Sequence, residues 1–167
     1  MRKNRIGALL FVSAIVITVG LAVASPARAE YPIVRLVSVQ NGMCLQPVNG
    51  SLNQGDAIVQ APCNGSLAQQ WTDEPVSWTS THLVNRASHL CLNARGGARN
   101  GTPIQQWTCN WISNQKWNFG ITNNLLGSNV SGTGSHCIAT PGGQAGLPME
   151  LRFCDGNAAQ LWNRPPG

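Results

Sequence analysis

The sequence predicts an all-β domain with pseudo-threefold symmetry. The tripeptides Gln69-Gln70-Trp71, Gln115-Lys116-Trp117 and Gln160-Leu161-Trp162 recur at intervals of 46 and 45 residues. Glycine and proline are abundant, and no long segment has helical periodicity, so the composition favours short strands joined by turns. Threefold repetition argues against the alternative of an ordinary two-sheet sandwich.

Each repeat has the same landmarks in the same order. A valine is followed by a first cysteine, a glycine, an apolar residue and a second cysteine; in chain order these are Val37, Cys44, Gly55, Ile58 and Cys63, then Val84, Cys91, Gly101, Ile104 and Cys109, then Val130, Cys137, Gly146, Met149 and Cys154. Only the gap between first cysteine and glycine varies, at 11, 10 and 9 residues, which predicts a surface loop there. The clearest predicted strands are 33–39, 104–109 and 149–154. The repeats span about 32–74, 76–119 and 121–165.

The first 29 residues predict a secretory signal peptide. A head with three basic residues precedes an apolar run over 6–24, and Ala27-Arg28-Ala29 is an A-x-A cleavage signature. The alternative is an uncleaved membrane anchor, because the apolar run approaches the length that spans a bilayer. Cleavage leaves residues 30–167 as one secreted, extracellular domain without membrane insertion.

Removal of the signal peptide changes the charge of the chain. Four of the eleven basic residues lie in it, so residues 30–167 have seven basic and six acidic residues. A net charge of +1 lacks the clustered basic surface that a nucleic-acid partner requires. No nucleic-acid partner is therefore expected.

All six cysteines lie within residues 30–167, one pair in each repeat. An even number of cysteines in an exported chain predicts disulfides. The economical pairing joins Cys44 to Cys63, Cys91 to Cys109, and Cys137 to Cys154. Each bridge is worth roughly 3 kcal/mol in the chain-entropy model. A metal site would favour close C-x-x-C pairs, which the sequence lacks, so neither a metal nor a cofactor is expected.

The three Q-x-W motifs, each after a cysteine-bounded strand pair, resemble those of the ricin-type (R-type) lectins over essentially all of residues 30–167. The segments Pro32-Ile33-Val34-Arg35-Leu36-Val37 and Asn41-Gly42-Met43-Cys44 look like the start of a plant galactose-binding chain of this family. The resemblance implies a β-trefoil, with six strands in a short barrel and six in hairpins that cap one end. It also implies that Trp71, Trp117 and Trp162 are structural core residues, and large buried aromatic side chains suit a small all-β core. Because ricin-type domains are often attached to an enzyme or toxin, a separate effector chain is a possible partner.

The second repeat is predicted to bind carbohydrate. A sugar site needs an aromatic wall and a few placed polar groups, and residues four and two before the second cysteine share a strand face. These pairs are Val59 and Ala61, Gln105 and Trp107, and Glu150 and Arg152. The family pattern adds an aspartate two residues after the first cysteine, an asparagine and the motif glutamine; these positions hold Gln46, Ala68 and Gln69 in the first repeat, Asn93, Asn114 and Gln115 in the second, and Ala139, Ala159 and Gln160 in the third. The predicted carbohydrate-binding residues are therefore Asn93, Gln105, Trp107, Asn114 and Gln115, and the other two repeats are interpreted as scaffold.

The second repeat departs from the family pattern only at Asn93, where an aspartate is expected. A neutral hydrogen bond is weaker than a charge-assisted one by about 1 kcal/mol, or roughly tenfold in affinity. The sequence thus predicts one weak site for a galactose-like or other hexose or pentose unit.

Three other interpretations remain open. Trp107 could merely cover the barrel, with no repeat binding a sugar. A non-sugar-binding trefoil could act through protein contacts as an inhibitor or partner subunit, since fold does not fix function. A glycosidase would need two facing carboxylates, and the sequence suggests no such pair, so the chain is not expected to be an enzyme. Trp111 is interpreted as a packing residue.

Overall fold

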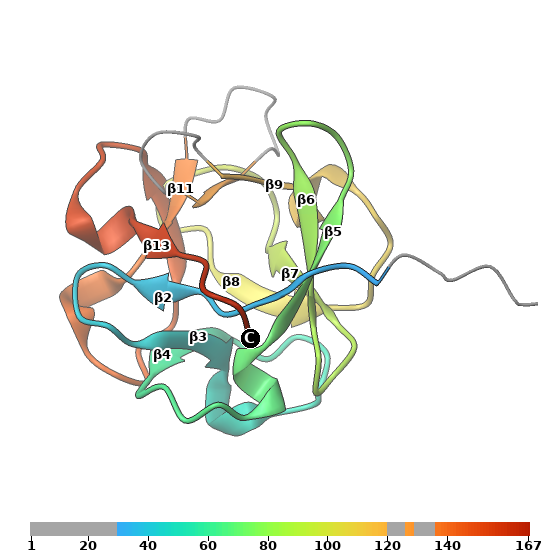
Figure 1. The fold of residues 1–167 in the computed structure, drawn as a ribbon. Helices are drawn as coiled ribbons and strands as arrows, with labels where there is room; N and C mark the ends of the chain where they lie inside the picture. Colours follow the sequence, from blue (N-terminus) through green and yellow to red (C-terminus); the bar gives the residue numbers. More distant parts are fainter. Residues whose placement is uncertain (1–29, 120–125, 129–135) are drawn as a thin grey trace, which may run out of the picture.

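The computed structural model describes residues 30–119, 126–128 and 136–167. The predicted signal peptide and Val130 of the third repeat lie outside these residues. Figure 1 shows short strands arranged in three groups around one centre. No helix among the residues just named is long and apolar enough to cross a membrane.

The elements are short strands and single turns of 3₁₀-helix. The part of the chain before the second repeat contains β1 (Ile33–Val34), β2 (Val37–Ser38), β3 (Cys44–Pro47), η1 (Val48–Gly50), β4 (Ile58–Ala61), η2 (Leu67–Gln69) and β5 (Trp71–Pro75). The second repeat contains β6 (Thr81–Asn85), β7 (Cys91–Ala94), β8 (Ile104–Trp107), η3 (Ser113–Gln115) and β9 (Trp117–Phe119). The third contains β10 (Leu126–Ser128), β11 (His136–Ala139), η4 (Pro141–Gly143), β12 (Glu150–Phe153), η5 (Ala158–Gln160) and β13 (Trp162–Asn163).

Each repeat is built on an equivalent antiparallel hairpin. These hairpins are β3–β4, β7–β8 and β11–β12, and in each the first cysteine lies opposite the residue two positions before the second cysteine. A 3₁₀ turn and a strand that begins at or next to the motif tryptophan follow each hairpin. The predicted all-β architecture with threefold repetition is therefore confirmed.

The repeats are joined to one another through their equivalent glycines. The Gly55 N–H donates to the carbonyl of Gln106 at 2.8 Å, that of Gly101 to Leu151 at 2.8 Å, and that of Gly146 to Gln60 at 2.9 Å. These bonds run from the first repeat to the second, from the second to the third, and from the third back to the first. The three glycines have φ values of 88°, 81° and 81°, a region that a residue without Cβ enters at little steric cost.

The core lies where the three repeats meet. Ile58, Ile104 and Met149 are fully buried, and backbone bonds link Ile104 to Met149 and Met149 to Ile58 at 3.0 and 2.8 Å. The three motif tryptophans are also fully buried. Their indole N–H groups donate to the carbonyls of Leu45, Leu92 and Ile138, the residues that follow each first cysteine, at 3.2, 2.9 and 3.2 Å. Each tryptophan therefore fills the core and ties its strand to the hairpin of its own repeat.

The three disulfides join the predicted pairs, Cys44–Cys63, Cys91–Cys109 and Cys137–Cys154, with Cα–Cα distances of 5.0, 5.1 and 5.2 Å. Each second cysteine lies just beyond the end of its strand, at Ala61, Trp107 or Phe153. The bridge thus fixes the start of the loop that leads to the 3₁₀ turn. The predicted strands at 104–109 and 149–154 are accordingly shorter than expected.

The single strand predicted over 33–39 is wrong, because the structure has two strands there, β1 and β2. β1 pairs with β5, whereas β2 pairs with β3 and β13. Arg35 between them bonds through its N–H to the carbonyl of Pro165 at 2.9 Å. The segment therefore changes partners midway, which a continuous run of β-forming residues does not reveal.

Replacing Trp117 by phenylalanine should destabilise the fold by about 1–3 kcal/mol, since the buried Leu92 carbonyl loses its donor. Urea denaturation would measure this as a lower midpoint. Trp78→Phe is the matched control because Trp78 is fully exposed, and its effect should stay within about 0.5 kcal/mol. Equal midpoints for the two variants would contradict the structural role assigned to the motif tryptophan.

Candidate functional site

A cavity of about 430 Å³ opens on the second repeat. It is lined by Gly55, Asn93, Arg95, Gly96, Gln105, Trp107, Asn110, Ile112 and Asn114. Four of the five residues predicted to bind carbohydrate are therefore brought together: Asn93, Gln105, Trp107 and Asn114. The fifth, Gln115, is not part of the lining.

The strands β7 and β8 form one wall of this cavity. Asn93 and Gln105 are directly opposite each other in the antiparallel register, which places their Cβ atoms roughly 5 Å apart on one face. Trp107 lies two residues after Gln105 and therefore shares that face. A Cβ on Gly55 of the first repeat would lie 3.5 Å from the Cζ3 atom of Trp107, so the indole ring packs against the Gly55 backbone. The exposed fraction of Trp107 is 37%, and the ring is thus both supported and accessible.

The buried amides of this cavity lack partners on the protein. Asn93 is 5% exposed and Gln105 is 8% exposed, and across the described ranges neither side chain has a hydrogen bond within the protein. None of their amide atoms is both buried and without a partner, so these nitrogen and oxygen atoms reach the solvent of the cavity. The exposed or half-buried amides of Asn110 and Asn114 are similarly uncommitted within that part of the chain. The wall therefore offers donors and acceptors to a polar ligand.

Gln115 does not line the cavity but holds the loop that does. Its side chain is fully buried, its amide donates to the Thr108 carbonyl at 2.8 Å, and its oxygen accepts from the N–H groups of Asn110 and Trp111 at 3.0 Å. Gln69 and Gln160 likewise bond the backbone that follows their own strands. The motif glutamine therefore makes equivalent hydrogen bonds to the backbone in all three repeats. The predicted sugar-binding role of Gln115 did not take this shared structural role into account.

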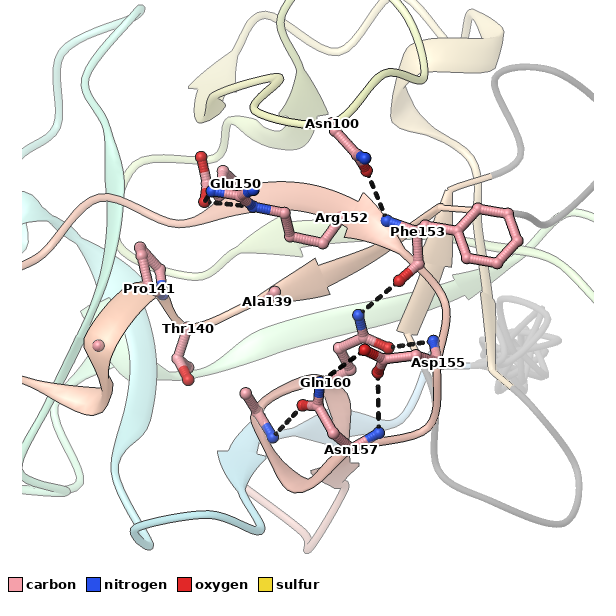
Figure 2. A pocket seen from close by; sticks show the side chains of 12 residues that line it. Asn100, Ala139, Thr140, Pro141, Glu150, Arg152, Phe153, Asp155, Asn157 and Gln160 are labelled. Atoms are coloured by element: carbon pink, nitrogen blue, oxygen red, sulfur yellow. Dashed lines mark hydrogen bonds and ion pairs between the residues drawn. The ribbon is translucent and has the colours of Figure 1, made fainter.

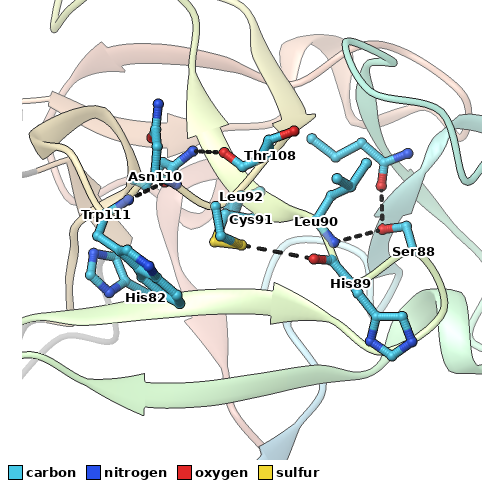
Figure 3. Close-up of a disulfide and its surroundings, with 12 residues drawn as sticks. His82, Ser88, His89, Leu90, Cys91, Leu92, Thr108, Asn110 and Trp111 are labelled. Carbon is cyan, nitrogen blue, oxygen red and sulfur yellow. Dashed lines mark hydrogen bonds between the residues drawn. A yellow bond between two sulfur atoms is a disulfide. The ribbon is translucent and has the colours of Figure 1, made fainter.

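The loop after Cys109 alternates between the cavity and the barrel wall. Asn110, Ile112 and Asn114 line the cavity, whereas Trp111 packs on His82 of β6 (Figure 3). The centroids of these two rings are 4.7 Å apart. Trp111 has a φ of 59°, an uncommon conformation for a bulky residue. The hydrogen bond from its N–H to the Gln115 side chain and the tilted ring contact with His82 hold Trp111 in this conformation.

His82 is buried beneath Trp111, and its Nε2 atom has no hydrogen-bond partner among the described residues. Burial lowers the pKa of the His82 imidazole below its ordinary value of 6.5, and the nearby Lys116 ammonium lowers this pKa further. Both effects favour the neutral ring, because the charged form loses hydration and meets a like charge.

A second cavity, of about 510 Å³, lies at the equivalent position of the third repeat (Figure 2). Glu150 and Arg152 stand where Gln105 and Trp107 stand in the second repeat, and they form an ion pair at 2.5 Å. Asp155 accepts from the backbone and side-chain nitrogens of Asn157 at 3.0 and 2.9 Å, and Asn100 accepts from the Phe153 N–H at 2.7 Å. These polar groups are thus engaged with one another or with the backbone, and the Thr140 hydroxyl donates to Gln40 at 2.7 Å. The carboxylates of Glu150 and Asp155 share one cavity, although the sequence suggested no such pair.

The first repeat has an apolar surface at the corresponding strand positions. Val59 is 3% exposed and Ala61 is half-buried, so neither supplies a polar group or an aromatic ring. Gln46, which is equivalent to Asn93, accepts from the amide of Gln69 at 2.8 Å. Within the described ranges, no three His, Cys, Asp or Glu side chains gather as metal ligands would.

Comparison with known proteins identifies the family. A family model described as the ricin-type beta-trefoil lectin domain matches residues 32–162. No curated protein matches the sequence to a significant degree. Among solved structures, the designed threefold-symmetric protein ThreeFoil has a TM-score of 0.73 and 21% identity, over 79% of this chain and 96% of its own. The C-terminal half of an earthworm R-type lectin in complex with GalNAc has a TM-score of 0.66 and 11% identity, over 81% of this chain and 99% of its own.

An exo-β-1,3-galactanase from Clostridium thermocellum is also similar, with a TM-score of 0.70 and 25% identity over 83% of this chain. The match covers 31% of the galactanase chain, so the likeness concerns one part of that enzyme.

Acidification should destabilise the protein through His82. Because its pKa is lowered in the folded state, the unfolded chain binds a proton first as the pH falls below about 6.5. The contribution to folding free energy is thus fully present above that pH and is lost as the pH drops through the folded pKa. Urea denaturation between pH 5 and pH 7.5 would measure it, with His82→Gln as the comparison. The variant should show a smaller loss of stability on acidification; an identical pH dependence would contradict this assignment.

Proposed function

Because the chain belongs to the ricin-type β-trefoil lectin family, we propose that it is a secreted carbohydrate-binding protein whose second repeat holds the saccharide. The observation that supports this site most directly is that the mostly buried side chains of Asn93 and Gln105 line the cavity beside the exposed face of Trp107, with no hydrogen bond from either amide to the described residues. An apolar wall with a few uncommitted polar groups is the usual form of a small-ligand site.

The proposed binding mode follows from the chemistry of a sugar ring. The C–H face of the ring packs on Trp107, and the hydroxyl edge meets Asn93, Gln105 and Asn114. An asparagine amide has both an acceptor oxygen and a donor nitrogen, so Asn93 can bridge two hydroxyls by accepting from one and donating to the other. All of these bonds are neutral, and we therefore expect weak affinity for a galactose-like or other hexose or pentose unit.

The third-repeat cavity is a poorer candidate although it is larger. A saccharide there would compete with the Glu150–Arg152 ion pair and with the hydrogen bonds of Asp155. It would also find no aromatic side chain at the position equivalent to Trp107. A saccharide in the second-repeat cavity would displace no such interaction, because the amides there have no hydrogen bonds to the described residues.

We propose no catalytic step. Glycoside hydrolysis uses two carboxylates that flank the scissile bond. Glu150 and Asp155 line the third-repeat cavity together, and each carboxylate is already bonded to a neighbouring side chain. Secretion is supported by the signal-like first 29 residues and by the three disulfides, which persist in oxidising compartments.

Replacing Trp107 by alanine should lower saccharide affinity by roughly tenfold or more, about 1.4 kcal/mol, while the fold persists because the ring is surface-exposed. A glycan array would identify ligands, and calorimetric titration would give their affinities. Phe153→Ala is the matched control, since Phe153 is 61% exposed and lies at the end of the equivalent strand β12. Retention of glycans by Trp107→Ala equal to that of the native protein would exclude the second-repeat site. A tight protein partner, insensitive to free sugars, would instead favour action through protein contacts.

A further inference from the structure

Arg95 is the one charged residue among those that line the second-repeat cavity. We propose that this arginine makes the site selective for an anionic saccharide, one that bears a carboxylate as a uronic acid does, or a sulfate. The inference rests on the proposed function, because it names the class of sugar that the same cavity takes.

The guanidinium of Arg95 is uncommitted. Its side chain is exposed and has neither an ion pair nor a hydrogen bond to any other described residue, and no acidic residue lines this cavity. Arg152, the arginine of the third-repeat cavity, is instead neutralised by Glu150 at 2.5 Å. The two cavities therefore differ in sign: the second has one unpaired positive charge, and the third has two carboxylates against one arginine.

The backbone fixes Arg95 at the rim. It directly follows β7, and its N–H donates to the Pro103 carbonyl at 2.9 Å. Gly96 beside it also lines the cavity, and a Cβ there would meet nothing within 4 Å. The equivalent positions in the other repeats hold Val48 and Pro141, so the charge at this position is particular to the second repeat.

The neutral residue at position 93 leaves this charge available. Asn93 and Arg95 are two residues apart, the same separation as Glu150 and Arg152, which pair in the third repeat. An aspartate at position 93, as the family pattern has it, would place a carboxylate in the lining of the same cavity as Arg95. The asparagine removes that competitor, so a ligand anion is the remaining partner for the guanidinium fork, whose planar donors match carboxylate and sulfate oxygens.

The test compares matched sugars that differ in charge: galactose with galacturonic acid and with galactose 6-sulfate, and glucose with glucuronic acid. At low ionic strength the native protein should bind the anionic member of a pair about threefold to fivefold more tightly, as expected for an exposed ion pair. The preference should shrink in high salt, which screens exposed charges. Arg95→Gln should abolish this preference, so that the neutral and the anionic member of each pair bind with equal affinity. Arg152→Gln, at the paired arginine, should keep it.

The outcomes separate the inference from the function on which it rests. Equal affinity for neutral and anionic sugars in the native protein, with both lost in Trp107→Ala, would overturn the role of Arg95 and leave the second-repeat site intact. Anion preference that survives Arg95→Gln would overturn the role of Arg95 as well. Binding that Trp107→Ala leaves unchanged would overturn both. Preference for the carboxylate sugars alone, or for the sulfated sugar alone, would support the role of Arg95 and identify the anion.

Discussion

The ring of hydrogen bonds from Gly55, Gly101 and Gly146 is the constraint on which the rest of the structure depends. A single repeat of this size cannot bury its apolar face alone, so stability requires that neighbouring repeats enclose a common core. The ring closes that core around Ile58, Ile104 and Met149. The Gly55 bond also positions one wall of the candidate site, because it joins the Gly55 loop to Gln106 of β8. The Gln106 side chain holds the same loop, since its amide donates to the Ser51 and Asn53 carbonyls at 2.9 and 2.8 Å. Gly55 in turn supports the Trp107 ring, so the first repeat holds the aromatic wall of the second.

The same backbone supports three chemically different surfaces. Where the second repeat has the amide of Gln105 and the ring of Trp107, the third has Glu150 and Arg152, whose opposite charges attract each other along one strand. In the first repeat, Gln46 is bound by Gln69 and the strand positions are apolar. Threefold symmetry thus fixes where a cavity can form. The side chains at these positions determine whether the polar groups of the cavity are hydrogen-bonded within the protein or remain free to bind a ligand.

Much of the fold could be predicted from the sequence because repetition aligns equivalent positions. The disulfide pairs follow from the presence of one cysteine pair in each repeat, and the meeting of Gln105 with Trp107 follows from the two-residue period of a strand. The core position of the three motif tryptophans was implied by the resemblance to the ricin-type lectins. Gln115 shows the limit of this reasoning: spacing identifies it as equivalent to Gln69 and Gln160, but a 3₁₀ turn has no simple facing rule, so the direction of its side chain was not accessible. The break between β1 and β2 was also hidden, because both segments have β-forming residues and only their partners differ. Arg95 follows β7 where the loop of variable length begins, and position in such a loop gives no signal of what a side chain faces.

The proposed site in the second cavity combines mostly buried amides with an exposed positive charge. Asn93 and Gln105 are neutral, so their burial costs far less than that of a charge, and each can serve as donor or acceptor for a hydroxyl. Arg95 is exposed, so its charge stays hydrated when no ligand is bound and imposes no desolvation penalty on the fold. A buried arginine at this position would have needed a carboxylate partner, as Arg152 has in the third repeat even at its half-exposed site. In the proposed site, sugar hydroxyls would meet the mostly buried Asn93 and Gln105, and a ligand charge would meet the exposed Arg95. Selectivity for charge would then not require an unpaired buried ion.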